Sequence, residues 1–323
     1  MILKKEEATS TICLKKKTMN SVNKNNYLII FPFIFLVLLG LVMISSASIF
    51  LAEEQTLDPF YYISRQLLFV SVGLVSMSIF LIIPSSFLLK TDWLLVLISI
   101  LLLIALFVPN VGSSVNGSIR WIRLGSIGIQ PSEICKFSLI IYISGYCFRR
   151  ASELYSFRNF LKPLTLLSII SLLIMSQPDL GSTAIICLVV VAILFYAGIS
   201  FFQFSVLSLL ILLLGVAAIS TSPMRIARVM AFRDPFDSEI VFGSGYQLAN
   251  SLISIGQGGW TGLGLGNSFQ KNFFLPEAHT DFIFAILVEE LGVIGGIILI
   301  AAYMILFFGI LKVAIDCLNF GRV

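Results

Sequence analysis

The sequence predicts an all-α fold, a polytopic transmembrane helix bundle with a large extracytoplasmic loop. Three observations lead to this fold class. The 323-residue chain is 58% hydrophobic and only 12% charged, whereas about 25% of the residues of a soluble domain are charged. Its apolar residues form runs long enough to cross a bilayer. Because these runs do not alternate with polar residues, they predict helices rather than barrel strands.

The apolar runs predict about eight membrane spans. Several runs are shorter than the ~20 residues of a typical span, so we expect tilted or buried helices among them. The predicted spans cover residues 28–50, 66–86, 93–109, 133–148, 162–177, 181–198, 201–222 and 282–314.

Polar segments between and before these runs complete the organisation. Residues 1–26 are polar and lysine-rich, which predicts a cytoplasmic N-terminal tail followed by an uncleaved first span. Residues 27–323 are predicted to form one integral membrane domain. Lysine and arginine are more numerous on the side of the N-terminus, so the positive-inside rule places two segments, about 110–132 and 222–281, outside the cell.

Composition excludes several other classes of protein. The net charge is +4, but the basic residues form short clusters beside apolar runs, so nucleic acid is not an expected partner. The five cysteines form no C-x-x-C pair, which argues against a disulfide framework. The chain has a single histidine, His279, so a His-based metal cluster cannot form within it.

The first outer segment ends in a short polar motif before an apolar run. Pro131 suits the first turn of a helix, and Glu133 and Lys136 are three residues apart, as helical ion pairs often are. One interpretation is an interfacial anchor that includes Arg120 and Trp121, followed by an ion pair that holds the helix end. The other is a cationic lip for a lipid diphosphate. The spacing alone favours the anchor.

A second motif, Pro178-Asp179-Leu180-Gly181, lies between two apolar runs. An aspartate directly before a helix is a common N-cap, and this interpretation is favoured over a chemical role for Asp179.

The long outer segment carries arginines and glycines. Arg225 and Arg228 would share one face of a helix, as phosphate ligands often do, and Arg233 follows. The glycines between Gly256 and Gly266 loosely resemble a phosphate loop, but no Walker Lys-Ser/Thr follows them. The alternative is that they permit close approach between backbone segments.

Several ionisable residues gather around the start of the last apolar run. Asp281 stands where the loop becomes a membrane helix, and Glu289 lies eight residues further into the run. Charged groups at membrane depth are unfavourable, so a functional purpose is the default hypothesis. The alternative for Asp281 is a helix cap.

These motifs together resemble the SEDS (shape, elongation, division, sporulation) family of peptidoglycan glycosyltransferases, over residues from about 28 to the end. Ser113–Gly117 and Ala278 are similar to the FtsW (cell-division) branch rather than the RodA branch. The motifs in family order are Arg120-Trp121-Ile122, Gln130-Pro-Ser-Glu133 with Lys136, Pro178-Asp-Leu-Gly181, Gly245-Tyr-Gln247 and Pro276–Ala285.

The resemblance implies an activity, a location and partners. The implied enzyme polymerises lipid II, the undecaprenyl-linked disaccharide-pentapeptide, into glycan strands for septal cell-wall synthesis, by hexosyl transfer with inversion. Asp281 would be the catalytic general base. The implied location is the bacterial cytoplasmic (inner) membrane, with a cytoplasmic N-terminus. Implied partners are lipid II, the growing lipid-linked glycan, a class B penicillin-binding transpeptidase and other division proteins.

The leaving lipid diphosphate needs cationic stabilisation, for which the basic residues Arg120, Lys136, Arg225, Arg228, Arg233 and Lys271 are suited. No cofactor is identified, and a divalent cation at the diphosphate is left open. The candidate substrate-binding residues are Arg120, Glu133, Lys136, Arg225, Arg228, Arg233, Lys271, Glu277, His279 and Glu289.

Two further function classes stay open. The family has ten spans, and we expect the last two, with their outer loop, to be missing from this sequence, which would suit a non-catalytic division scaffold. Intramembrane carboxylates and glycine-broken helices also suit a lipid II flippase or transporter. The charged motifs gather at the predicted outer surface, where a polymerase would meet its substrate, and this favours the glycosyltransferase.

Overall fold

The computed structural model describes residues 26–109, 111–115, 118–124, 127–237, 241–272 and 274–321. The predicted cytoplasmic tail, residues 1–26, lies outside the described residues apart from Asn26. The described chain is mostly helical, which confirms the predicted fold class. It divides into two compact units: the first unit is Met1–Val75 with Ile226–Val323, and the second unit is Ser76–Arg225.

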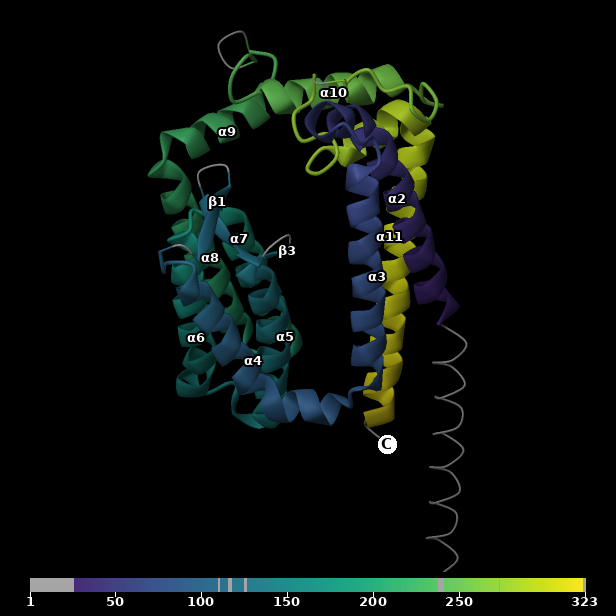
Figure 1. Cartoon of the computed structure of the whole chain (residues 1–323). Helices are drawn as coiled ribbons and strands as arrows, with labels where there is room; N and C mark the ends of the chain where they lie inside the picture. The colour runs from purple at the N-terminus through teal and green to yellow at the C-terminus, as the bar shows by residue number, and fades with distance from the viewer. Residues whose placement is uncertain are drawn as a thin grey trace, which may run out of the picture. The chain divides into compact units, whose positions relative to one another are not determined.

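Each of the eight predicted spans corresponds to a helix. Within the described residues, six helices are long and apolar enough to cross a membrane, namely α2, α3, α4, α6, α8 and α11, and α7 is apolar but shorter. The number of spans therefore stays a prediction. The eight helices (Figure 1) are α2 (Tyr27–Thr56), α3 (Tyr61–Ile82), α4 (Ser85–Ala105), α5 (Pro131–Arg149), α6 (Phe157–Met175), α7 (Leu180–Tyr196), α8 (Phe201–Ser220) and α11 (Ile283–Gly321).

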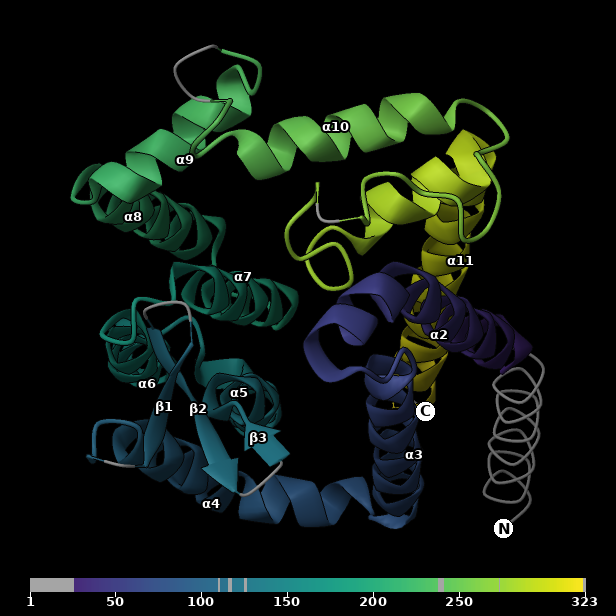
Figure 2. The same ribbon diagram turned by 45° about the horizontal axis from the view of Figure 1, so that its top comes forward.

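The second unit is built from α4 to α8, which gather around one apolar core (Figure 2). Leu103, Ile143 and Leu194 are completely buried in it. A hydrogen bond of 2.7 Å between the hydroxyls of Ser99 and Ser138 joins α4 to α5. Small polar pairs of this kind are common where membrane helices pack closely. A short helix, η1 (Ala151–Glu153), connects α5 to α6 (Phe157–Met175).

A small antiparallel sheet lies between α4 and α5 in the chain, and the sequence analysis did not predict it. Its strands are β1 (Gly112–Val115), β2 (Ser118–Leu124) and β3 (Ile127–Ile129), in the order β1-β2-β3. Trp121 of β2 pairs with Ser113 of β1. The strands are short, and β2 carries two arginines, so they do not stand out as apolar runs in the sequence. Pro131 occupies the first turn of α5, as predicted.

The first unit is organised around α11. Helix α2 runs beside it (Figures 1 and 2), and α10 (Tyr246–Gly258) packs on its beginning. A Cβ on Gly309 would lie 2.8 Å from the carbonyl oxygen of Leu28, so this glycine permits the close approach of α11 to α2. Met43 and Ile286 are buried between these helices.

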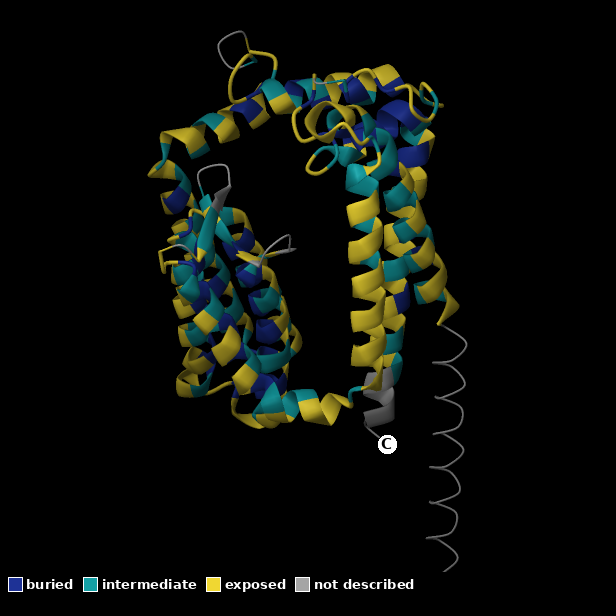
Figure 3. Cartoon of the chain, in the orientation of Figure 1, coloured by how far each residue is buried: buried dark blue, intermediate teal, exposed yellow. Residues whose placement is uncertain are grey.

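Burial differs sharply among the helices. Helix α3 has no buried residue, and its large apolar side chains are exposed along almost its whole length (Figure 3). Exposure of this kind is expected where lipid is the solvent. The segment 222–281, predicted to lie outside the cell, is more than a plain connector, because it forms α9 (Pro223–Arg233) and α10 (Tyr246–Gly258).

Candidate active site

Helix α11 is broken at Gly292, where the backbone leaves the helical region with φ 73° and ψ −179°. The last carbonyls before such a break lose their partners within the helix. In this structure, the amides of Leu263 and Gly264 donate hydrogen bonds to the carbonyls of Glu289 and Glu290, at 2.9 and 3.0 Å. Residues 258–266, here called the glycine-rich loop, therefore complete the end of the first half of α11.

The second half of α11 is completed by the same loop. The amide of Val293 donates to the carbonyl of Gly259 at 2.9 Å, and the amide of Ile294 donates to the carbonyl of Trp260 at 3.3 Å. An unpaired backbone group in the hydrocarbon core costs several kcal/mol, so irregular backbone at membrane depth is tolerated only when other protein groups satisfy it. The glycine-rich loop provides these partners.

The glycines are required because the backbone of the glycine-rich loop touches the backbone of α11. A Cβ on Gly262 would lie 2.1 Å from the carbonyl oxygen of Glu290, and a Cβ on Gly258 would lie 2.1 Å from that of Val288. Gly292 meets Trp260 in the same way, at 2.2 Å. The interpretation of the glycines between Gly256 and Gly266 as sites of close backbone approach is therefore confirmed for Gly258 and Gly262.

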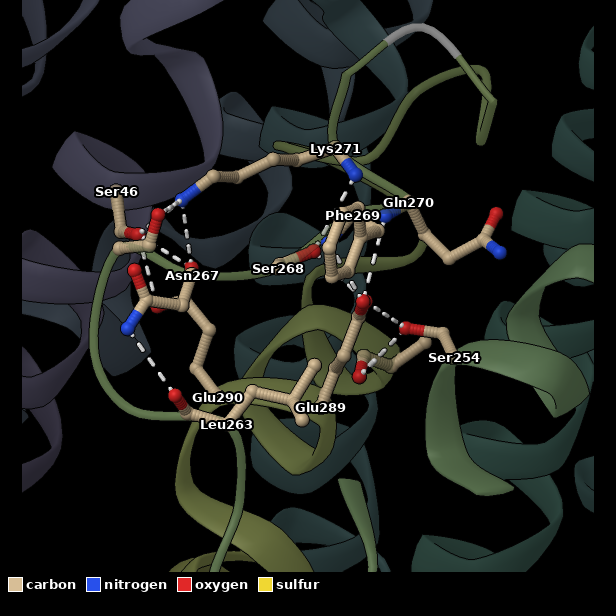
Figure 4. A network of polar contacts seen from close by, with 12 residues as sticks. Ser46, Ser254, Leu263, Asn267, Ser268, Phe269, Gln270, Lys271, Glu289 and Glu290 are labelled. Carbon is tan, nitrogen blue, oxygen red and sulfur yellow. Dashed lines mark hydrogen bonds and ion pairs between the residues drawn. The ribbon is translucent and has the colours of Figure 1, made fainter. Parts of the chain in front are cut away.

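The carboxylate of Glu289 is fully buried, and four donors satisfy it (Figure 4). The hydroxyls of Ser254 and Ser268 donate to its Oε2 at 2.5 and 2.7 Å. The backbone amides of Phe269 and Gln270 donate to its Oε1 at 2.7 and 3.3 Å. Glu289 thus connects α10, the segment that follows the glycine-rich loop, and α11.

The neighbouring Glu290 forms a buried ion pair with Lys271, with 2.8 Å between Nζ and Oε1 (Figure 4). The side chain of Lys271 is 2% exposed and that of Glu290 is 0% exposed. Ser46 of α2 donates its hydroxyl to both Glu290 oxygens, at 2.7 and 2.8 Å. Lys271 Nζ also donates to the carbonyl of Gly266 at 2.6 Å and to Ser46 Oγ at 3.1 Å.

A cavity of about 590 Å³ adjoins this ion pair. Ser46 and Lys271 border it together with apolar side chains that include Leu41, Phe50 and Leu265. Walls of this kind suit a hydrocarbon chain better than a charged head group.

Asp281 lies two residues before α11, and its side chain is exposed. Within the described residues, its carboxylate makes no hydrogen bond and no ion pair, so the structure does not show it acting as a helix cap. The preceding turn is held by Glu277, whose carboxylate accepts a hydrogen bond from the Thr280 hydroxyl at 2.7 Å. The amides of Thr280 and Phe282 donate to the Glu277 carbonyl, each at 3.2 Å.

His279 packs against an aromatic ring from α3. The ring centroids of His279 and Tyr62 are 4.8 Å apart, and the Tyr62 hydroxyl donates to Gln55 at 2.7 Å. Burial lowers the pKa of His279 below its ordinary value, and the nearby charge of Glu277 partly opposes this shift. The imidazole is therefore held toward its neutral form.

The three arginines of α9 differ in their contacts. Arg225 Nη1 donates to the carbonyl of Ala218 at 2.7 Å and so closes the last turn of α8. Arg228 and Arg233 are exposed, and neither makes a hydrogen bond or ion pair with any residue that the structure describes.

In the second unit, Arg120 and Asp179 form one local contact. Arg120 Nη2 donates to the carbonyl of Pro178 at 2.6 Å, and its Nε lies 3.7 Å from Asp179 Oδ2. Asp179 accepts hydrogen bonds from the amide and the hydroxyl of Ser182, at 3.1 and 2.8 Å. The N-cap interpretation of Asp179 is confirmed.

The predicted ion pair at the start of α5 is also present, with 2.7 Å between Lys136 Nζ and Glu133 Oε1. A second pair was not predicted. Arg149 Nη2 lies 2.6 Å from Asp92 Oδ2, and Asp92 is buried on α4. No spacing in the sequence connects Arg149 to Asp92.

The serine partners of the two glutamates were not predicted either. Ser46, Ser254 and Ser268 were not singled out, because serines are frequent within apolar helices and carry no signal of their own. Glu290 was not among the candidate residues predicted from the sequence. Among the described residues, no group of three or more His, Cys, Asp or Glu side chains is arranged to hold a metal ion.

The apolar helices, the broken α11 and the buried polar network define a multi-pass membrane protein. The family model of FtsW, RodA and SpoVE, described as "Cell cycle protein", matches residues 26–322. The chain belongs to this family.

Individual relatives agree with this assignment. The chain is 41% identical over 275 residues to "Probable peptidoglycan glycosyltransferase FtsW" of Alcanivorax borkumensis, covering 84% of this chain and 71% of the relative. Proteins of the same name are 44% identical in Saccharophagus degradans, over 83% of this chain and 69% of the relative, and in Aliivibrio salmonicida, over 88% and 70%.

Two solved structures share the fold. One is a chain from a study of structural coordination of polymerization and crosslinking by a peptidoglycan synthase complex. It matches with a TM-score of 0.65 at 24% identity, over 86% of this chain and 74% of that chain. The other is the rod shape determining protein RodA of Thermus thermophilus, with a TM-score of 0.57 at 23% identity, over 86% and 71%.

Proposed function

We propose that this chain is a peptidoglycan glycosyltransferase of the FtsW type, which polymerises lipid II into glycan strands for septal cell-wall synthesis. Its family membership and the names of its relatives support the reaction class. The observation that carries the proposal is the state of Asp281. It is exposed and has no partner among the described residues, whereas Glu289 and Glu290 are buried and fully hydrogen bonded.

In the proposed reaction, Asp281 acts as the general base. It accepts the proton of the acceptor sugar's 4-hydroxyl while that oxygen attacks the donor's anomeric carbon. The bond from this carbon to the diphosphate oxygen breaks, and the lipid diphosphate leaves with the electron pair. A single displacement inverts the configuration and needs no covalent enzyme intermediate. A base needs a free lone pair, which the exposed Asp281 carboxylate has.

The leaving diphosphate is proposed to be stabilised by Arg228 and Arg233. Both guanidinium groups are exposed and without a partner in the described part of the chain, so their donors are available to phosphate oxygens. Arg120, Lys136 and Arg225 already contact protein groups, so we rank them below these two. A divalent cation between the diphosphate oxygens would be part of the substrate complex, and loss of activity in EDTA would reveal it.

We propose the bacterial cytoplasmic (inner) membrane as the location, with the N-terminus inside and segment 222–281 outside. The test uses Ser244→Cys, an exposed position, in a background without native cysteines. An impermeant thiol reagent should label this cysteine in intact spheroplasts. Labelling only after the inner face is opened would reverse the orientation.

The proposed protein partner is a class B penicillin-binding transpeptidase. The likeness of the fold to a chain of a peptidoglycan synthase complex supports a partner that crosslinks the new strands. Co-purification from detergent with such a transpeptidase tests this.

The decisive experiment compares polymerisation with transport. The purified chain is placed in liposomes with fluorescent lipid II, and glycan strands and movement of lipid II across the bilayer are both measured. We expect strands. The broken α11 also suits a transporter, since such helices line substrate pathways in many of them. Movement of lipid II without strands would therefore favour a flippase.

A further inference from the structure

We propose that Lys271, Glu289 and Glu290 are positioning residues that fix the segment carrying Asp281, rather than residues that touch the substrate. This inference rests on the proposed function for its catalytic consequence, and on the geometry of the first unit for the contact itself. The three residues and Ser46 are here called the clamp.

The ammonium group of Lys271 has no donor left for a diphosphate. Its three N–H groups have three protein acceptors, which are Glu290 Oε1, the carbonyl of Gly266 and Ser46 Oγ. The acceptors come from α11, the glycine-rich loop and α2. Removing Lys271 would therefore disconnect three elements at one point.

The Lys271–Glu290 ion pair closes a loop of chain, and Asp281 lies in its middle. Residue 281 is ten positions after Lys271 and nine before Glu290. Glu289 holds the same end of the loop at a second point, because its carboxylate accepts hydrogen bonds from the amides of Phe269 and Gln270. Both of these contacts are on α11, the helix that begins two residues after Asp281. The position of Asp281 is thus set relative to a single helix.

A fixed position matters for a general base. Its oxygen must lie within hydrogen-bond reach of the hydroxyl that it deprotonates, and an error of 1 Å far from the chemistry can lower a rate about 100-fold. Buried ion pairs contribute little net stability, because desolvation offsets their attraction. We therefore explain the clamp by the single arrangement of the Asp281 loop that it selects, and not by added stability.

The test is a double-mutant cycle on lipid II polymerisation. Lys271→Met and Glu290→Met each leave one buried charge without its partner, whereas the double variant removes both charges and nearly keeps the volume. We expect each single variant to lower kcat at least ~10-fold with KM for lipid II nearly unchanged. The double variant should recover to within about threefold of the wild type. Lys312→Met, at an exposed lysine of α11, is the matched control.

A substrate ligand would behave differently. If Lys271 contacts the diphosphate from the adjoining cavity, the double variant stays at least as slow as Lys271→Met, and KM rises in both. That result overturns the inference. Should the single variants fail to fold, a folded and active double variant supports the clamp, and a folded but inactive one overturns it.

A second measurement does not depend on activity. A spin label at Phe274→Cys, an exposed position between Lys271 and Asp281, reports the mobility of the loop in a cysteine-free background. We expect higher mobility in both single variants and a spectrum close to the wild type in the double variant. Unchanged spectra in the single variants would overturn the clamp. A wild-type protein that makes no glycan would sink the proposed function alone, because the spectra still test the clamp.

Discussion

Three carboxylates lie within ten residues of one another in the chain, and their surroundings divide them into two groups. Glu289 and Glu290 are fully buried in the first half of α11, and each of their carboxylates accepts hydrogen bonds from protein donors. Asp281 precedes the helix, is exposed, and has no partner among the described residues. The difference teaches that an acidic side chain near the membrane is not by itself a sign of chemistry. Its hydrogen-bond partners separate a structural group from a reactive one.

The largest expected effect is at Asp281. Asp281→Asn keeps the shape of the side chain but cannot accept the proton, so polymerisation should fall by the ~10²–10⁴-fold typical of general-base catalysis. Expression and lipid II binding should stay near normal. Asp234→Asn is the matched control, because this exposed residue accepts a hydrogen bond from the Phe236 amide that an asparagine can keep. Near-normal glycan synthesis by Asp281→Asn would show that Asp281 is not the general base. Exposure would then not separate a reactive carboxylate from the structural ones.

The next largest effect is at the glycine-rich loop. Gly262→Ala places a Cβ 2.1 Å from the Glu290 carbonyl at a residue with φ +81°, and we expect it to lower the free energy of unfolding by about 3 kcal/mol or more. Gly256→Ala in α10 meets no atom within 4 Å and should be neutral or stabilising by about 0.5–1 kcal/mol. Thermal unfolding in detergent measures both. Equal melting temperatures would show that the loop does not touch α11.

A smaller effect is expected at the exposed arginines. Arg228→Gln should lower kcat on the order of tenfold, because an exposed guanidinium is partly screened and contributes less than a buried donor. Lys312→Gln, an exposed basic residue on α11, should leave the rate unchanged. If both substitutions have the same effect, Arg228 acts through general surface charge and does not contact the diphosphate.

The smallest effect concerns His279. Because burial lowers its pKa, the unfolded chain binds a proton at a higher pH than the folded chain does. Stability should therefore rise with pH between the lowered pKa and the ordinary value, and fall as pH drops through that window. His279→Phe should flatten this dependence, measured as melting temperature against pH, while Tyr62→Phe keeps the ring contact and should preserve it. A wild-type curve without this slope would contradict the burial of the imidazole.

The helices were predictable because a long apolar run has few alternatives in lipid. The N-cap at Asp179 and the Glu133–Lys136 pair were predictable for a similar reason, since each depends on residues only a few positions apart. The Asp92–Arg149 and Ser46–Glu290 contacts join residues far apart in the sequence. Only folding brings such residues together, and no local sequence pattern predicts their contacts.

The sequence also suggested a substrate-binding role for Lys271 that its surroundings make less suitable. A lysine in a segment predicted to lie outside the cell is suited to bind a diphosphate, and the sequence does not show that Glu290 lies against Lys271. Exposure decides the role of such a residue, and exposure is a property of the fold. The resemblance to the SEDS family indicated Asp281 as the candidate base, whereas its position before a membrane helix could be read from the apolar run that follows it.

The break at Gly292 has a consequence for motion. A glycine that interrupts a helix usually invites the idea of a hinge. Here, however, the backbone groups on both sides of Gly292 are bonded to the glycine-rich loop through four hydrogen bonds. Bending α11 at this point would leave those groups unpaired, at several kcal/mol each within lipid. We therefore expect the two halves of α11 and the glycine-rich loop to move together, so that a conformational change during substrate entry or strand release would leave these hydrogen bonds intact.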